Sequence, residues 1–98
     1  KEQWKVIPGF SLYQVSNFGR IRSFSKKKRG GFIKQSIGQK GYPVCRLLRD
    51  DDKYIFKRFH FFVCLTFFGR RPDHYHTCHF DGNKLNNSIE NLRYDTSL

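Results

Sequence analysis

The stretch from His79 to Tyr94 decides the fold, and its sequence is HFDGNKLNNSIENLRY. Its centre, Asp81-Gly82-Asn83, is a tight-turn signal, because glycine tolerates a positive φ and Asx side chains bond back to the local backbone. His79 stands just before that turn. An imidazole is a common proton acceptor for a water that attacks an ester, provided that another group fixes which ring nitrogen is free. Asn91, later in the same stretch, could determine which nitrogen of His79 is free if the loop folds back.

Length and charge limit the class of protein. The 98 residues suffice for one domain with a modest core. Nineteen basic residues against eight acidic ones give a net charge of +11, which indicates a polyanionic partner, with nucleic acid as the first candidate. Three cysteines without a CxxC indicate neither a disulfide framework nor a zinc finger, and they fit a reducing compartment. No apolar run reaches the roughly 20 residues of a membrane span, so we expect a soluble protein. The chain contains no methionine, so we expect that Lys1 is either exposed by processing or is the point at which a longer protein was cut.

The first 25 residues predict short strands joined by turns. Between Gly19 and Phe24, alternation places Ile21 on one face and Arg20 and Arg22 on the other, which is the period of a half-buried strand. We therefore expect a basic outer face on these strands. The run from Lys26 to Arg29 that follows is either a solvated loop or a contact with phosphate.

Two apolar, aromatic and basic segments, 41–49 and 54–59, flank an acidic run. This arrangement predicts a hairpin with Asp50, Asp51 and Asp52 at its tip. The next segment, His60 to Phe68, is apolar on every side, so periodicity alone does not separate a buried helix from a buried strand.

Three segments resemble the homing-type HNH endonucleases. The stretch from His79 to Tyr94 is close to the signature of that family, which has a His, a DGN turn, paired asparagines and a closing NL[RE][WY]. The segment 59–68 begins FHFFV and is similar to the helical segment, usually VHRLVA, that precedes the signature, so the resemblance predicts a helix there. The sequences EQWKVIPGF (2–10) and YQVSNFGRIRS (13–23) are similar to NUMOD4, a small module that commonly precedes such nucleases.

The resemblance implies a ββα-metal site that hydrolyses DNA phosphodiester bonds with one divalent ion, Mg²⁺ or Mn²⁺. It implies His79 as the general base and Asn91 as the residue whose side chain holds the His-bearing loop. Cys78 occupies the position at which several members have an aspartate metal ligand, and a hard cation prefers oxygen to sulfur. The family's third ligand, on a following helix, would lie beyond Leu98, so the metal ligands stay open. The resemblance further implies a phage, virus or intron protein of the cytoplasm or nucleus. Its partner would be double-stranded DNA, and it would act as a homodimer or as part of a longer chain.

We therefore predict an α+β fold. It has short antiparallel N-terminal strands, a short buried helix at about His60 to Phe68, and a ββα-metal motif whose last helix is missing. We expect one compact unit made of a NUMOD4-like module (1–25), a basic loop and hairpin (26–58) and an HNH nuclease motif (59–98). The expected DNA-contacting residues are Arg20, Arg22, Lys26, Lys27, Lys28 and Arg29.

Other interpretations of the same residues remain open. The main alternative is a catalytically inactive or truncated HNH-derived DNA-binding or structural module, and the third is an RNA-binding piece. Residues 76–79 could coordinate zinc, but on a strand His76 and Cys78 face one side while His79 faces the other. His60 is expected to be packed and hydrogen-bonded rather than catalytic. Six other positions have structural interpretations. Cys45 and Cys64 are expected in the core, and turn or cap roles are expected for Asp81, Asn83, Asn86 and Asn87.

Overall fold

The computed structural model describes residues 1–25 and 31–96, and it contains one α-helix and three small antiparallel sheets in this part of the chain. The sheets have the strand orders β1-β2-β3-β4, β5-β6-β7 and β8-β9. The elements in chain order are β1 (Trp4–Ile7), β2 (Phe10–Ser16), β3 (Ile21–Ser23), β4 (Gly31–Phe32), β5 (Ser36–Ile37), a 3-10 turn (Gln39–Gly41), β6 (Pro43–Leu48), β7 (Tyr54–Arg58), α1 (Phe59–Phe67), β8 (His76–His79), a second 3-10 turn (Ile89–Asn91) and β9 (Leu92–Asp95). The predicted α+β fold class is confirmed.

The first sheet is built around turns that the sequence signals. Gly9 joins β1 to β2 with a φ of +82°, a conformation in which only glycine is free of strain. β3 pairs with β2, and the predicted alternation is confirmed, because Ile21 is buried while Arg20 is exposed and Arg22 half-buried. The basic side chains therefore lie on the outer face of this sheet.

The predicted hairpin is also confirmed. β6 and β7 pair antiparallel from Val44 opposite Arg58 to Leu48 opposite Tyr54. At the acidic tip, the Arg49 guanidinium bonds the Asp51 carboxylate with an N–O distance of 2.8 Å. One face of the hairpin enters the core through buried side chains such as Leu47.

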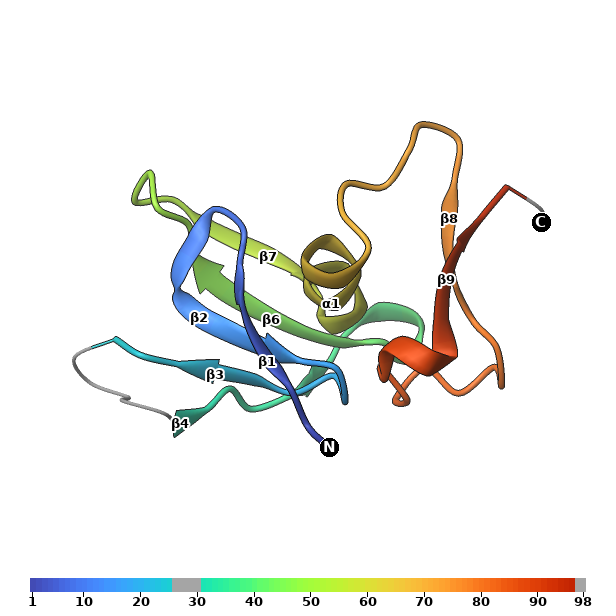
Figure 1. Cartoon of the computed structure of the whole chain (residues 1–98), viewed down its shortest axis with the longest axis horizontal. Helices are drawn as coiled ribbons and strands as arrows, with labels where there is room; N and C mark the ends of the chain where they lie inside the picture. Colours follow the sequence, from blue (N-terminus) through green and yellow to red (C-terminus); the bar gives the residue numbers. More distant parts are fainter. Residues whose placement is uncertain (26–30, 97–98) are drawn as a thin grey trace.

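Helix α1 confirms the helix that the resemblance predicted, one residue earlier than expected. The helix contacts β1, β2, β6, β7, β8 and β9, and Figure 1 shows it between the β6–β7 hairpin and the β8–β9 pair. Contacts on several sides explain its lack of a polar stripe: Phe59, Phe62, Val63 and Cys64 are all at most 1% exposed. None of the described helices is long and apolar enough to cross a membrane.

The loop between β8 and β9 rests on the turn between β2 and β3. The Ile89 N–H donates to the Asn17 carbonyl at 2.9 Å. Gly19 approaches the same loop so closely that a Cβ at this position would lie 2.6 Å from the Asn87 carbonyl oxygen. The N-terminal sheet therefore sets the position of a loop about 70 residues further along the chain.

Candidate active site

The last residue of β8, His79, is half-buried and hydrogen-bonded through one ring nitrogen. Its Nε2 lies 2.8 Å from the side-chain Oδ1 of Asn87. Because a carboxamide oxygen only accepts hydrogen bonds, this contact assigns the proton of the neutral ring to Nε2 and leaves a lone pair on Nδ1. The site therefore holds an imidazole whose second nitrogen can accept a proton.

Two further rings pack around this imidazole. His60 comes from the first turn of α1, and its ring centroid lies 5.3 Å from that of His79. Tyr42, just before β6, lies 5.4 Å from His60 and 6.0 Å from His79. The Arg58 guanidinium stacks on the Tyr42 ring at 3.9 Å, and the Lys84 ammonium lies 4.9 Å from the same ring. Two rings and two cations from distant parts of the sequence thus gather beside the candidate base.

His60 is a buried, neutral member of this group. It is 9% exposed, and burial, together with the nearby His79, Arg58 and Arg71, lowers its pKa to about 4. Its Nδ1 and the Nδ2 of Asn87 are the two buried side-chain polar atoms without a hydrogen-bond partner in the described part of the chain. The prediction that His60 is packed is confirmed, but the prediction that it is hydrogen-bonded is wrong for Nδ1. Unpaired buried polar atoms are rare, and here both belong to residues that contact the candidate base.

Asn91 holds the turn that follows His79 rather than the imidazole itself. Its Nδ2 donates to Asp81 Oδ1 and to the Asn86 carbonyl, each at 2.9 Å, and its Oδ1 accepts from the Asp81 N–H at 3.1 Å. Its own carbonyl accepts from the Phe80 N–H at 2.8 Å. The 80–86 turn is therefore tied to the buried Asn91 at three residues.

The Asp81 carboxylate is used inside this turn. It accepts hydrogen bonds from the Asn86 side chain, the Asn83 N–H and the Asn91 side chain, and these bonds lower its pKa. The expected turn roles of Asp81, Asn83 and Asn86 are confirmed. For Asn87 the same expectation missed its contact with the imidazole, although the doubled asparagine of the motif was a signal that one of the two could have another partner.

The described residues do not form a complete metal site. In residues 1–25 and 31–96, no group of three or more His, Cys, Asp or Glu side chains lies close enough to hold an ion. On β8 the alternation of side chains puts Cys78 and His79 on opposite faces. The Cys78 thiol donates a long hydrogen bond of 4.0 Å to the His76 carbonyl, and the Asp81 oxygens are already bonded as described. Neither the zinc alternative nor a magnesium site finds its ligands within this part of the chain.

The expected DNA-contacting arginines lie elsewhere, in a stack on the first sheet. Arg20 bonds Glu2 through its Nε at 2.8 Å and lies 4.3 Å from the Phe32 ring. Arg22 lies 4.0 Å from the Trp4 ring. The hydrogen bond from Arg20 lowers the pKa of Glu2 to about 2. Each guanidinium stacks on an aromatic ring, with Arg20 exposed and Arg22 half-buried. Lys26, Lys27, Lys28 and Arg29 lie outside the described residues.

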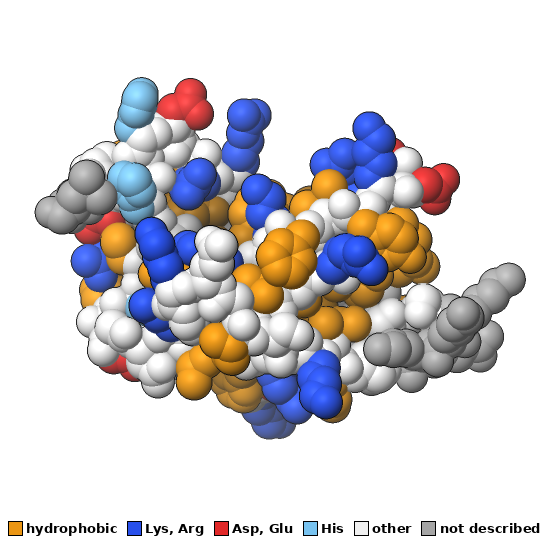
Figure 2. Space-filling view, turned by 180° about the vertical axis from the view of Figure 1, so that it is seen from behind, with side chains coloured by type: hydrophobic (Ala, Val, Ile, Leu, Met, Phe, Trp, Pro, Cys, Tyr) orange, Lys and Arg blue, Asp and Glu red, His pale blue; other side chains and the backbone are white. Residues whose placement is uncertain are grey.

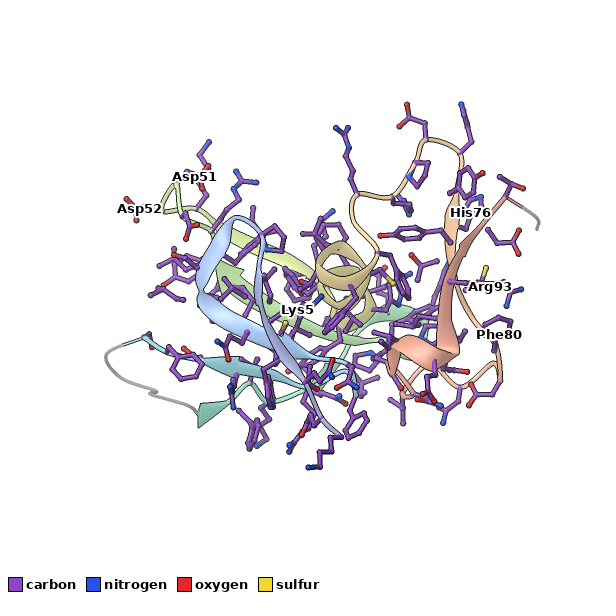
Figure 3. All side chains as sticks on the ribbon, in the orientation of Figure 1. Lys5, Asp51, Asp52, His76, Phe80 and Arg93 are labelled. Carbon is purple, nitrogen blue, oxygen red and sulfur yellow. The ribbon has the colours of Figure 1, made fainter. Side chains whose placement is uncertain are left out.

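A second exposed cation–aromatic pair lies next to the candidate base. Phe80 is 64% exposed, and the Arg93 guanidinium from β9 lies 4.2 Å from its ring. Figure 3 shows Phe80 and Arg93 together on the side of the β8–β9 pair that faces away from α1. Sequence reasoning did not single out either residue, because the pair forms only when the two strands are placed side by side.

Comparisons with known proteins agree with this arrangement. Residues 2–47 match the family model of the NUMOD4 motif, and residues 57–97 match the model described as HNH endonuclease. The chain is 37% identical over 92 residues to an uncharacterized HNH endonuclease of Acanthamoeba polyphaga mimivirus, a match that covers 94% of this chain and 26% of that protein. It is 35% identical over 95 residues to the DNA endonuclease I-HmuI of Bacillus phage SP01, with 96% of this chain and 52% of that protein covered.

The fold is also similar to a solved structure. The solved structure of the HNH homing endonuclease I-HmuI, which concerns its DNA binding and cleavage, is similar to this fold. The TM-score is 0.81 and the sequence identity 35%, and the match covers 96% of this chain and 52% of that one. The chain thus spans about a quarter of the mimivirus protein and about half of the phage enzyme.

Proposed function

Because the chain belongs to the HNH endonuclease family and carries a NUMOD4 motif ahead of its HNH motif, we propose that it is the nuclease part of a homing-type DNA endonuclease. The reaction is hydrolysis of a DNA phosphodiester bond. The observation that carries this proposal is the bond between His79 and Asn87, which leaves Nδ1 of the imidazole free to act as a base.

In this proposal His79 takes a proton from the attacking water. Nδ1 accepts the proton while Nε2–H stays bonded to Asn87 Oδ1, so the ring keeps its orientation as it becomes positively charged. A neutral His60 beside it adds no repulsion to that charge, because burial keeps the pKa of His60 near 4. Asn91 acts as a positioning residue, since it fixes the turn that directly follows the base.

We further propose that cleavage depends on a divalent ion, Mg²⁺ or Mn²⁺, as is general for HNH endonucleases. The described residues do not supply a ligand set for it. Cys78, at the position of the usual aspartate, is a poor partner for a hard cation. The ligands of the ion in this protein therefore stay unassigned.

Double-stranded DNA is the proposed partner. The net charge of +11 favours a polyanion, and Figure 2 shows a face on which Lys and Arg side chains are interspersed with hydrophobic ones, while acidic side chains lie near its margins. Arg20, with 51% of its side chain exposed, and the neighbouring Arg22 are proposed to contact backbone phosphates from the first sheet. The run from Lys26 to Arg29 is proposed to extend that contact.

The test is a nicking assay on supercoiled plasmid with this chain and with the full-length product of its gene. Mg²⁺ or Mn²⁺ is present or removed with EDTA, and His79→Ala is compared with His76→Ala. His76 is the matched control, because it is an exposed histidine on the same strand. We expect relaxation that needs the metal and His79 but not His76, with unchanged DNA affinity in His79→Ala.

Other results would change the proposal. Cleavage that survives His79→Ala would remove His79 as the base. Tight, salt-sensitive DNA binding without cleavage by either protein would support the inactive DNA-binding module. A preference for RNA over duplex DNA would support the third alternative.

A further inference from the structure

The N-terminal end of helix α1 is open to an anion. The helix has nine residues, its N-cap Arg58 makes no side-chain capping bond, and its first turn holds no acidic residue. The first N–H groups of a helix have no intrahelical partner and form the positive end of its dipole. Most helices satisfy this end with a Ser, Thr, Asp or Asn side chain. Here that partner is missing.

A basic cavity adjoins this helix end. It has a volume of about 620 Å³, and its charged side chains are Lys57, Arg58 and Arg71, with no carboxylate in its lining. None of the three cations forms a salt bridge within residues 1–25 and 31–96. Two of them are held by aromatic rings instead: Arg58 stacks on Tyr42, and the Lys57 ammonium lies 5.2 Å from the Phe61 ring. The cavity therefore presents positive charge with no carboxylate in its lining, and two of its three cations are held by rings.

His60, in the first turn of the helix, lies between this cavity and the candidate base. His60 lines the cavity, is more than nine-tenths buried and keeps its Nδ1 without a hydrogen-bond partner. The His60 ring also packs on His79. One imidazole thus separates the cavity from the candidate base.

We propose that a phosphate group of the DNA backbone docks in this cavity, between Lys57, Arg58 and Arg71 and beside the N-terminus of α1. It is a neighbour of the phosphate on which His79 acts, because His60 lines the cavity and also packs on His79. The helix N–H groups and the guanidinium forks suit the oxygens of a phosphodiester. This inference rests on the proposed DNA-cleaving function, which it deepens by assigning a second phosphate position.

The first test uses inorganic phosphate as the probe and amide NMR shifts of the full-length protein as the measurement. We expect phosphate to shift the backbone amides of Phe59, His60 and Phe61, and Arg71→Gln to abolish or strongly weaken these shifts. Arg71 lies on an exposed segment, so the substitution leaves the core intact. Arg46→Gln is the matched control, because Arg46 is an exposed arginine that stacks on Tyr54 and does not line the cavity. Shifts confined to other amides, or equally weakened by Arg46→Gln, would overturn the site.

The second test separates DNA phosphate from free phosphate. The affinity of the His79→Ala protein for duplex DNA is measured over a range of salt concentrations. One lost phosphate contact should flatten the slope of log affinity against log salt by about 0.9 in Arg71→Gln. An unchanged slope despite lost phosphate shifts would mean that the site binds a free anion, and it would refute the DNA assignment. If the Arg71→Gln results are as expected but neither this chain nor the full-length protein cleaves DNA, the proposed nuclease activity fails and the phosphate site stands.

Discussion

Replacing Asn91 by alanine should destabilise the fold by about 3 kcal/mol. The substitution removes three side-chain hydrogen bonds, two of them to Asp81 and one to the Asn86 carbonyl, from a residue that is 8% exposed. Hydrogen bonds within a protein contribute about 0.5–1.5 kcal/mol each, so the loss of three amounts to about 3 kcal/mol. In a domain of this size, a loss of about 3 kcal/mol lowers the melting temperature by more than roughly 10 °C.

The measurement is urea and thermal unfolding of Asn91→Ala beside Asn83→Ala. Asn83 is the control, because it lies in the same turn but its side chain makes one exposed bond, to the Leu85 N–H at 3.0 Å. We expect Asn83→Ala to lose no more than about 1 kcal/mol. The nicking rate of Asn91→Ala should also fall at temperatures where it is still folded, because the turn after His79 is released. Equal losses of stability in the two variants would refute the view that Asn91 anchors the turn.

Three other substitutions test the packing and the charges. Gly19→Ala should lower the free energy of unfolding by about 1–3 kcal/mol and slow nicking, because the new Cβ would displace Asn87 from His79. If the variant has the unfolding midpoint and the nicking rate of the wild type, this expectation is wrong. The pKa of His60 in the folded protein is about 4, against an ordinary value of 6.5. The part of the folding stability that depends on a neutral His60 should therefore be fully present above pH 6.5 and be lost as the pH drops towards 4. His60→Phe should flatten this part of the profile of melting temperature against pH, and parallel profiles would exclude His60 as the cause. The pKa of Glu2 is lowered from 4.5 to about 2, so its contribution is present above pH 4.5 and is lost as the pH falls towards 2. Glu2→Gln should therefore lose a little stability at pH 7 and show a shallower acid decline in circular dichroism, and an unchanged decline would count against the Glu2–Arg20 pair.

The sequence was sufficient for features that depend on local patterns. Alternation around Ile21 predicted a half-buried strand, and the acidic run at Asp50–Asp52 predicted the hairpin tip. Helix α1 needed the resemblance as well, since a segment that is apolar on every side fits a helix and a strand equally well. The turn at Asp81-Gly82-Asn83 was visible from residue types alone.

Local sequence patterns did not predict the contacts between distant segments. The alternation of side chains along a strand predicted that Arg20 faces outward. Its bond to Glu2, however, depends on how the chain N-terminal to β1 lies beside β3. The partner of His79 was expected to be Asn91, whereas Asn87 occupies that place because the close approach of Gly19 fixes the loop. The packing of Tyr42 and His60 on His79 joins three segments that no local period relates.

The contact between the 80–91 loop and the turn that joins β2 to β3 also limits how such genes can recombine. Asn17 and Gly19 belong to the NUMOD4 match, whereas Asn87 and Ile89 belong to the HNH match. A crossover between the two motifs that brought in a bulkier residue at position 19 would leave both halves intact in sequence and yet separate the loop from its support. Exchange of one motif without the other should therefore succeed only among partners that keep a glycine at this turn.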